Sequence, residues 1–85
     1  MPDIKKLFDD ATVAAKSLKK RPSDDDLLLI YALYKQATTG DVQGERPGFF
    51  DFVGGAKHDA WTKLKGMSTA EAMQKYIAKV NTLKG

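Results

Sequence analysis

The stretch from Asp26 to Thr38 constrains the fold most, because it is an apolar run of helical period with no glycine or proline inside it. At 3.6 residues per turn, its apolar side chains cover one face and part of the next. The second face also carries two phenols and an ammonium, from Tyr31, Tyr34 and Lys35. A surface helix of a small bundle needs only one apolar stripe. The extra face indicates either a helix buried on two sides, with its hydroxyls reaching water, or a helix that contacts an apolar, negatively charged ligand.

Composition limits the chain to one small domain that is held together by packing. Its 85 residues allow one core, and the absence of cysteine excludes disulfides and cysteine-based zinc sites. The net charge of +3 is too small and too dispersed for a nucleic-acid-binding arm. The sequence has no apolar run of about 18 residues and no apolar N-terminal signal segment. We therefore expect an intracellular, cytoplasmic protein in which residues 1–85 form one domain without stable membrane insertion.

A first helix is predicted over about Asp3–Lys19 by a continuous apolar stripe. Pro2 suits its start, and Pro22 ends it. Ser23, with Asp26 three residues on, forms a capping pair for the helix that follows. The chain therefore begins with two helices joined by a short connection.

The end of this first helix carries a basic cluster made of Lys16, Lys19, Lys20 and Arg21. The cluster could bind phosphate, but complementarity to the helix dipole explains most of it. Lys16 is the member that can turn inward, beside Thr12 and Phe8.

Thr39–Gly55 contains too many glycines for a helix and is longer than the usual connection between bundle helices. About 14 extended residues can reach over about 45 Å, twice the length of a 15-residue helix at about 22 Å, so the next helix can run parallel to the one before. Arg46 is expected to hold the loop through Asp41 or Asp51, in preference to binding an anion. The loop also has three aromatic residues, at least one of which should pack on the bundle as an anchor: Phe49, Phe50 and Phe52.

The third helix is predicted over about Gly54–Lys65, and a capping box starts the fourth, Ser68–Leu83. Lys57 falls within the apolar arc of the third helix, where it either extends past the rim of the core or faces a ligand. His58 points away from that arc and is expected to be exposed. Tyr76 is expected in the core stripe of the fourth helix, with its hydroxyl at an opening.

No catalytic or metal-binding motif is present. The single histidine has no obvious serine or aspartate partner, and there is no HExxH, Walker or GxGxxG sequence. The three consecutive aspartates that start at Asp24 lack the spacing of a metal site. The chain is therefore expected to bind a ligand without metal or catalysis.

Several sequence segments are highly specific in combination: Tyr31-Ala-Leu-Tyr-Lys-Gln-Ala-Thr38, Glu45-Arg-Pro-Gly48, Asp59-Ala-Trp61 and Tyr76-Ile77. With them the whole chain resembles the acyl-CoA-binding protein family, also called diazepam-binding inhibitor. The resemblance implies an all-α fold, a four-helix bundle in up-down-down-up order with a long overhand loop between helices two and three. It also implies a carrier and pool former for medium- to long-chain acyl-CoA, with no cofactor and no enzymatic activity. Transient contact with acyl-CoA-using enzymes or membranes is compatible with that role.

The resemblance also implies which residues bind. Positions that match the family's contacts to the CoA head group and its 3′-phosphate are Lys16, Tyr31, Tyr34, Lys35, Lys57 and Tyr76. Positions near the acyl chain and pantetheine are Phe8, Thr12 and Leu27. The chain departs from the family at Val53 and Gly55, where lysine is usual, and at His58, where tryptophan is usual. With two cations fewer, binding is expected to be weaker or more tolerant of salt.

Two other functions remain open from the residues. The Tyr31/Tyr34 face could be a groove for a partner helix, which would make the chain a helical interaction module. An acyl-CoA hydrolase or transferase is the second alternative, and the missing nucleophile–base pair argues against it.

Overall fold

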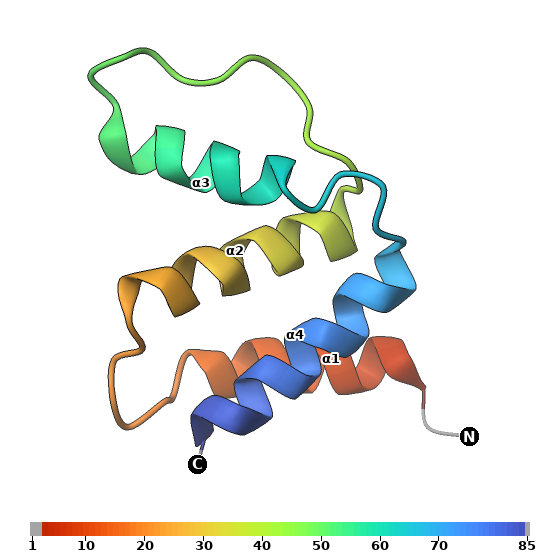
Figure 1. The fold of residues 1–85 in the computed structure, drawn as a ribbon. Helices are drawn as coiled ribbons and strands as arrows, with labels where there is room; N and C mark the ends of the chain where they lie inside the picture. Colours follow the sequence, from red (N-terminus) through yellow and green to blue (C-terminus); the bar gives the residue numbers. More distant parts are fainter. Residues whose placement is uncertain (1–2, 85) are drawn as a thin grey trace.

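The computed structural model describes residues 3–84, which form four helices: α1 (Ile4–Ala15), α2 (Asp24–Thr38), α3 (Phe52–Thr62) and α4 (Thr69–Lys84). α1 and α4 run in one direction, whereas α2 and α3 run in the opposite direction (Figure 1). α2 packs against α3 and α4, and α4 packs against α1. The predicted all-α, up-down-down-up bundle is confirmed, with no strand in the described residues. No helix between residues 3 and 84 is both long and apolar enough to cross a membrane.

Side-chain caps fix the start of each helix, as the sequence predicted for two of them. Ser23 Oγ accepts the amide of Asp26 at 3.1 Å, and Ser68 Oγ accepts the amide of Glu71 at 3.1 Å. Asp51 Oδ1 accepts the amide of Gly54 at 2.9 Å, so α3 begins at Phe52, two residues earlier than predicted. Each cap satisfies one of the free amides of a first turn.

The first helix is shorter than predicted, because it ends at Ala15 and not near Lys19. The amides of Lys16 and Ser17 bond to carbonyls three residues back, which tightens the last turn. Beyond Ala15 only Leu18 continues the apolar stripe, and a helix with so little to bury gains little from tertiary packing. Most of the basic cluster therefore lies in the connection between α1 and α2 and does not cap a helix.

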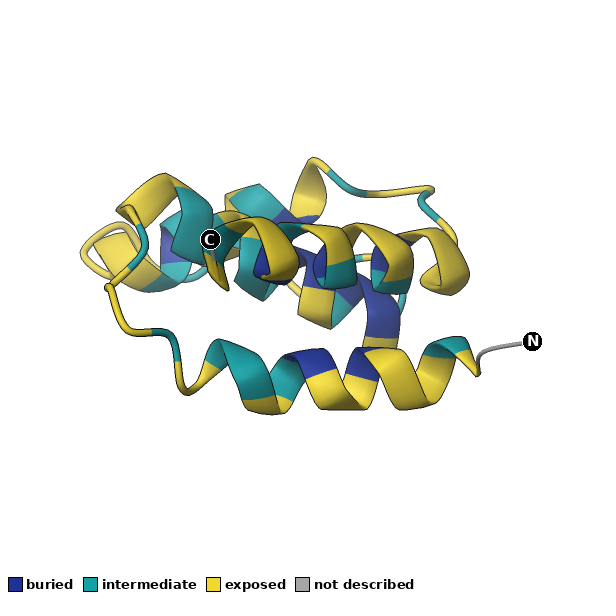
Figure 2. Cartoon of the chain, turned by 90° about the horizontal axis from the view of Figure 1, so that it is seen from below, coloured by how far each residue is buried: buried dark blue, intermediate teal, exposed yellow. Residues whose placement is uncertain are grey.

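The core lies where α1, α2 and α4 meet. Its buried side chains are Phe8, Ala11, Leu33, Ala37, Ala72, Tyr76 and Val80. Figure 2 shows the buried segments of α1 on the side that faces the other helices. α3 contributes the buried Trp61, whose Nε1–H donates to the carbonyl of Gly40 at 2.8 Å. The tyrosine at position 76 is buried in the core stripe, as predicted.

A buried glutamine ties the end of α2 to the turn before α4. Gln36 is fully buried, and its Nε2 donates to Asp41 Oδ1 at 2.9 Å and to the carbonyl of Met67 at 2.8 Å. The same Asp41 oxygen accepts the amide of Gly66 at 2.8 Å. These bonds lower the pKa of Asp41, the Gly66 amide having the largest effect and Gln36 the next. This network fixes where the overhand loop leaves α2.

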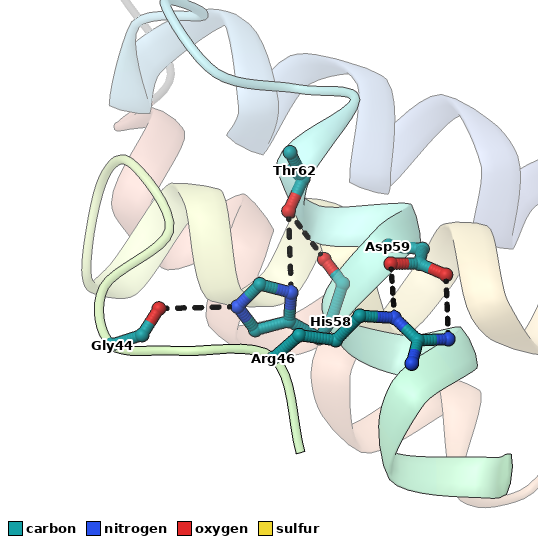
Figure 3. A network of polar contacts seen from close by, with 5 residues as sticks. All are labelled: Gly44, Arg46, His58, Asp59 and Thr62. Atoms are coloured by element: carbon teal, nitrogen blue, oxygen red, sulfur yellow. Dashed lines mark hydrogen bonds and ion pairs between the residues drawn. The ribbon is translucent and has the colours of Figure 1, made fainter. Parts of the chain in front are cut away.

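The overhand loop is held on α3 by contacts that the sequence did not predict (Figure 3). Arg46 pairs with Asp59, with Nε–Oδ1 at 3.0 Å and Nη2–Oδ2 at 3.2 Å, so the prediction of Asp41 or Asp51 as its partner is wrong. The hydrogen bonds from Arg46 lower the pKa of Asp59. His58 is half-buried and not exposed, with Nε2 3.3 Å from the carbonyl oxygen of Gly44.

The predicted aromatic anchor of the loop is also wrong. Phe49, Phe50 and Phe52 are 79%, 85% and 72% exposed, and they contact one another rather than the core. The polar contacts of Arg46, His58 and Asp41, and not the phenylalanine rings, hold the loop. The three rings are left facing solvent.

Candidate functional site

Two lysine–aromatic pairs join α2 to α3 at successive turns. Lys57 Nζ of α3 lies 5.1 Å from the ring centre of Tyr31 on α2. Lys35 Nζ of α2 lies 5.1 Å from the ring centre of Trp61 on α3. At the first turn the ring belongs to α2 and the lysine to α3, and at the next turn the lysine belongs to α2 and the ring to α3. This order follows because the parallel helices place positions 31 and 35 opposite positions 57 and 61. Both ammonium groups therefore lie at the α2–α3 junction, where each gains a cation–π contact.

Neither of these lysines forms an ion pair within residues 3–84. Lys57 is exposed, and Lys35 is partly buried. An ammonium that rests on an aromatic face, without a carboxylate, keeps its full charge available to an anion. The junction is therefore a cationic position lined by aromatic rings, which suits a phosphorylated ligand with a flat ring.

An aromatic cluster lies next to this junction, where α1, α2 and α4 meet. The ring of Phe8 lies 5.0 Å from that of Tyr76, edge to face, and 6.0 Å from that of Tyr34, stacked. Tyr34 and Tyr76 are 6.4 Å apart. Because Tyr34 is one helical turn from Tyr31, α2 places the cluster beside the lysine pairs. Burial raises the pKa of Tyr76, and the nearby Tyr34 adds to the effect, so its hydroxyl stays protonated as a donor.

A mostly apolar cavity of about 420 Å³ opens between the N-terminal halves of α2 and α3, and we call it the α2–α3 cavity. It is lined by Arg21, Asp24, Leu27, Leu28, Phe52, Val53, Ala56 and Lys57. Lys57 thus belongs both to the cationic junction and to the apolar cavity. A single ligand with a charged head and an apolar tail could contact both.

The other predicted tail residues lie elsewhere. Phe8 and Thr12 line a cavity of about 380 Å³ with Tyr34. Phe8 itself is buried in the core. The Thr12 hydroxyl donates to the carbonyl of Asp9 at 2.6 Å. The structure therefore brings Tyr31, Lys35, Lys57 and Leu27 to the α2–α3 side, and Phe8, Thr12, Tyr34 and Tyr76 to the α1–α2 side.

Lys16 is the one predicted site residue that the structure does not bring to the others. It follows the last residue of α1 and is exposed, and it lines neither of the two cavities that other predicted site residues line.

Sequence reasoning missed the pairing of Trp61 with Lys35 and the presence of Arg21 in the cavity wall. The signal for the first was present in the sequence. An aromatic and a lysine four residues apart occur in both helices, in opposite order, as Tyr31 with Lys35 and Lys57 with Trp61. Only the parallel register of α2 and α3 turns that pattern into contacts. No local signal indicated that Arg21 would line the cavity.

The three positions where the chain departs from the resembled family all lie on α3. Val53 lines the α2–α3 cavity. Gly55 lies against the guanidinium of Arg46, so that a Cβ at position 55 would come 2.7 Å from Nη2. His58 contacts the overhand loop at Gly44. Glycine at position 55 therefore leaves room for the Arg46 side chain that holds the loop. No group of three or more metal-ligating side chains is found in the described part of the chain.

Comparison with known proteins agrees with this geometry. The family model described as Acyl CoA binding protein matches residues 5–80. An acyl-CoA-binding protein homolog of Manduca sexta is 48% identical over 81 residues, covering 94% of this chain and 90% of its own. Acyl-CoA-binding protein homolog 1 of Caenorhabditis elegans is 47% identical over 76 residues, or 89% of this chain and 88% of its own.

Solved structures show the same likeness. The crystal structure of Oryza sativa acyl-CoA-binding protein 2 superposes with a TM-score of 0.91 at 43% sequence identity. The superposition covers 95% of this chain and 90% of the rice chain. The four-helix arrangement, the match over most of the chain and the similarity to relatives from three organisms lead to one conclusion: this chain belongs to the acyl-CoA-binding protein family.

Proposed function

We propose that this chain binds medium- to long-chain acyl-CoA thioesters non-covalently and acts as an intracellular carrier and pool former for them. Residues 1–85 would form one acyl-CoA-binding domain in the cytoplasm. The observation that carries the proposal is the double position of Lys57. Its Nζ lies over the ring of Tyr31 in the cationic junction, and its side chain lines the apolar α2–α3 cavity with Leu27.

The head of the ligand is assigned to the junction and the neighbouring aromatic cluster. Lys35 and Lys57 would bind the phosphates, because both are cationic and free of carboxylate partners among residues 3–84. The rings of Tyr31, Tyr34 and Tyr76 would pack against the adenine and ribose or donate hydrogen bonds to them. Each charge-assisted bond to a phosphate contributes about 1.5–3 kcal/mol. Lys16, which is exposed, would add long-range attraction to the phosphates.

The tail of the ligand is assigned to the apolar walls. Leu27 would contact it in the α2–α3 cavity, and Phe8 and Thr12 would contact the pantetheine arm beside Tyr34. Each buried methylene contributes about 0.8 kcal/mol, so a long tail supplies on the order of 10 kcal/mol before the entropic costs of binding. The tail would therefore set the affinity, and the head group the specificity.

We also propose that the chain carries out no chemistry on its ligand. His58 contacts Gly44 and Thr62, and neither belongs to the proposed site. The hydroxyl of Thr62 donates to the carbonyl of His58 in its own helix, at 2.8 Å. The single histidine is therefore engaged with the overhand loop and its own helix, away from the proposed site, where it would not activate a nucleophile against a thioester.

Calorimetry with palmitoyl-CoA, free CoA and palmitate tests the proposal. We expect the thioester to bind most tightly, because only it presents phosphates and a tail together, and we expect it to remain intact on prolonged incubation. Tight binding of palmitate without binding of the thioester would overturn the proposal. Loss of thioester during incubation would indicate a hydrolase. No binding of any of the three, with recovery of a helical partner protein, would indicate an interaction module.

A further inference from the structure

An exposed apolar surface lies where the overhand loop meets α3, and we call it the aromatic tip: Phe49, Phe50, Phe52 and Val53. Their exposed fractions are 79%, 85%, 72% and 67%. The ring of Phe49 lies 5.3 Å from that of Phe50 and 6.5 Å from that of Phe52, both edge to face. The three rings are therefore one continuous surface, and a continuous exposed apolar surface of this kind marks an interaction site.

The aromatic tip continues into the α2–α3 cavity. Phe52 and Val53 belong to both, since they line the cavity together with Leu27. Phe49 and Phe50 lie outside the cavity, on the loop that leads into α3. An apolar path therefore runs from the outermost rings of the tip to the walls assigned to the acyl tail.

The basic connection between α1 and α2 lies at the same end of the molecule (Figure 1). Arg21 lines the mouth of the cavity beside Phe52, and Lys19 and Lys20 are exposed. Two carboxylates at this end form ion pairs. Arg21 pairs with Asp24 at 3.0 Å, and Asp26 pairs with Lys79 at 2.7 Å. Asp25 and Asp51 are exposed at the same end, and Asp51 lies between Phe50 and Phe52. The end of the molecule is thus rich in exposed rings at its tip and carries charges of both signs around it.

We propose that the aromatic tip docks on a phospholipid bilayer, with Phe49 and Phe50 in the interfacial layer and the mouth of the cavity against the membrane. Aromatic rings favour the boundary between headgroups and acyl chains, and the exposed Lys19 and Lys20 can contact lipid phosphates. The tip is formed by a turn and a helix end, which can enter a soft interface, whereas a partner helix would need a groove. Docking in this way would let an acyl tail move between bilayer and cavity without crossing water. Only this transfer step rests on the proposed function.

Co-sedimentation with phosphatidylcholine vesicles, with and without phosphatidylserine, tests the surface. The test variant is Phe49→Ser with Phe50→Ser, which removes the outer rings but no residue of the cavity wall. We expect its partition coefficient to fall by about tenfold or more, because burial of one phenylalanine accounts for about that factor. Phe49→Trp with Phe50→Trp should keep or raise the partition. Leu7→Ser, a partly exposed apolar position on α1, should leave it unchanged.

The outcomes distinguish a failure of the membrane-docking proposal from a failure of the acyl-CoA-binding proposal. Palmitoyl-CoA is titrated into the serine variant in the absence of vesicles, and an unchanged affinity shows that the variant folds and keeps its ligand site. Vesicle binding that is absent in the unaltered protein, or equal in the serine variant, would overturn the docking surface even if acyl-CoA binds. A dimer in sedimentation that depends on Phe49 and Phe50 would overturn it too. Phe-dependent vesicle binding without acyl-CoA binding would support the surface and refute only the carrier function.

Discussion

Lys57 of α3 and Tyr31 of α2 meet with Nζ 5.1 Å from the ring centre, one turn from the matching contact of Lys35 with Trp61. Because each ammonium rests on a ring and not on a carboxylate, the two positive charges gather at one helix junction without being neutralised there. An anion at the junction would therefore meet two ammonium groups whose charge no carboxylate among residues 3–84 neutralises. This is why the junction, rather than the basic connection after α1, is the place to expect phosphate.

Gln36 should be a determinant of stability and not of binding. Gln36→Ala removes two hydrogen bonds from a fully buried side chain and leaves a cavity. We expect the free energy of unfolding to fall by about 2–4 kcal/mol. Chemical denaturation measures this loss, and Gln36→Met, which keeps most of the volume, separates the polar part from the packing part. Stability of Gln36→Ala equal to that of the unaltered protein would contradict the prediction.

Asp41 should make the fold sensitive to acid. Hydrogen bonds from the Gly66 amide and from Gln36 hold the pKa of Asp41 below its usual value. The unfolded chain therefore binds this proton more tightly, so the stability that Asp41 contributes is complete above the unfolded pKa of about 3.9 and is lost as pH falls through the lower folded value. Asp41→Asn should be less stable at neutral pH and lose less on acidification.

Urea unfolding between neutral pH and about pH 2 follows the effect of Asp41 across this range. Glu45→Gln, which changes an exposed carboxyl of the same loop, is the control and should follow the unaltered protein. Parallel curves for Asp41→Asn and the unaltered protein would contradict the assignment.

The contribution of Tyr76 to the stability of the fold should be lost at pH values above its pKa. Burial raises that pKa, followed by the effect of Tyr34, so the folded state favours the neutral phenol. Its contribution is intact below the unfolded pKa of about 10 and is lost as pH rises through the folded value. Tyr76→Phe should unfold as the native protein does at neutral pH and lose less stability in alkali. Thermal unfolding at neutral and alkaline pH decides this, and Tyr34→Phe provides a comparison at the exposed member of the cluster.

Val53→Lys should restore a cation at the mouth of the α2–α3 cavity. The added charge is exposed, and a pair of that kind contributes about 0.2–1 kcal/mol, so affinity for palmitoyl-CoA should rise by at most about fivefold at low salt. High salt should remove the gain. Val53→Met, which lengthens the side chain without charge, should show no such salt dependence. A gain that is the same for both variants would mean that contact area, and not charge, is responsible.

Local features were predictable from the sequence, and features that depend on helix register were not. The caps at Ser23 and Ser68 involve residues only three positions away, and the structure confirms both. The contact between Lys35 and Trp61 joins residues 26 positions apart, so it exists only through the parallel packing of α2 and α3. Periodicity alone left open whether the second face of α2 served burial or binding. The order and direction of the four helices were predicted from the family resemblance. The sequence pattern alone showed only that this arrangement was geometrically possible.

Two wrong predictions have a common physical cause. The exposure of Phe49 and the pairing of Arg46 with Asp59 both depend on the path of the overhand loop. Phenylalanine side chains are buried on average, which is why burial was predicted. In the structure, hydrogen bonds from the loop to α3 determine the path of the loop, and that path leaves the ring exposed. The early end of α1 at Ala15 arises similarly, because helix propensity extends beyond the point where tertiary packing stops.

The central claim, that the α2–α3 junction holds the phosphorylated head of an acyl-CoA, is tested most directly by calorimetric titration of palmitoyl-CoA into Lys35→Ala and Lys57→Ala. Lys63→Ala, an exposed lysine of the turn after α3, is the matched control. We predict that each junction variant loses about 1.5–3 kcal/mol of binding free energy and that the control does not. Affinities of Lys35→Ala and Lys57→Ala equal to that of Lys63→Ala would contradict the account.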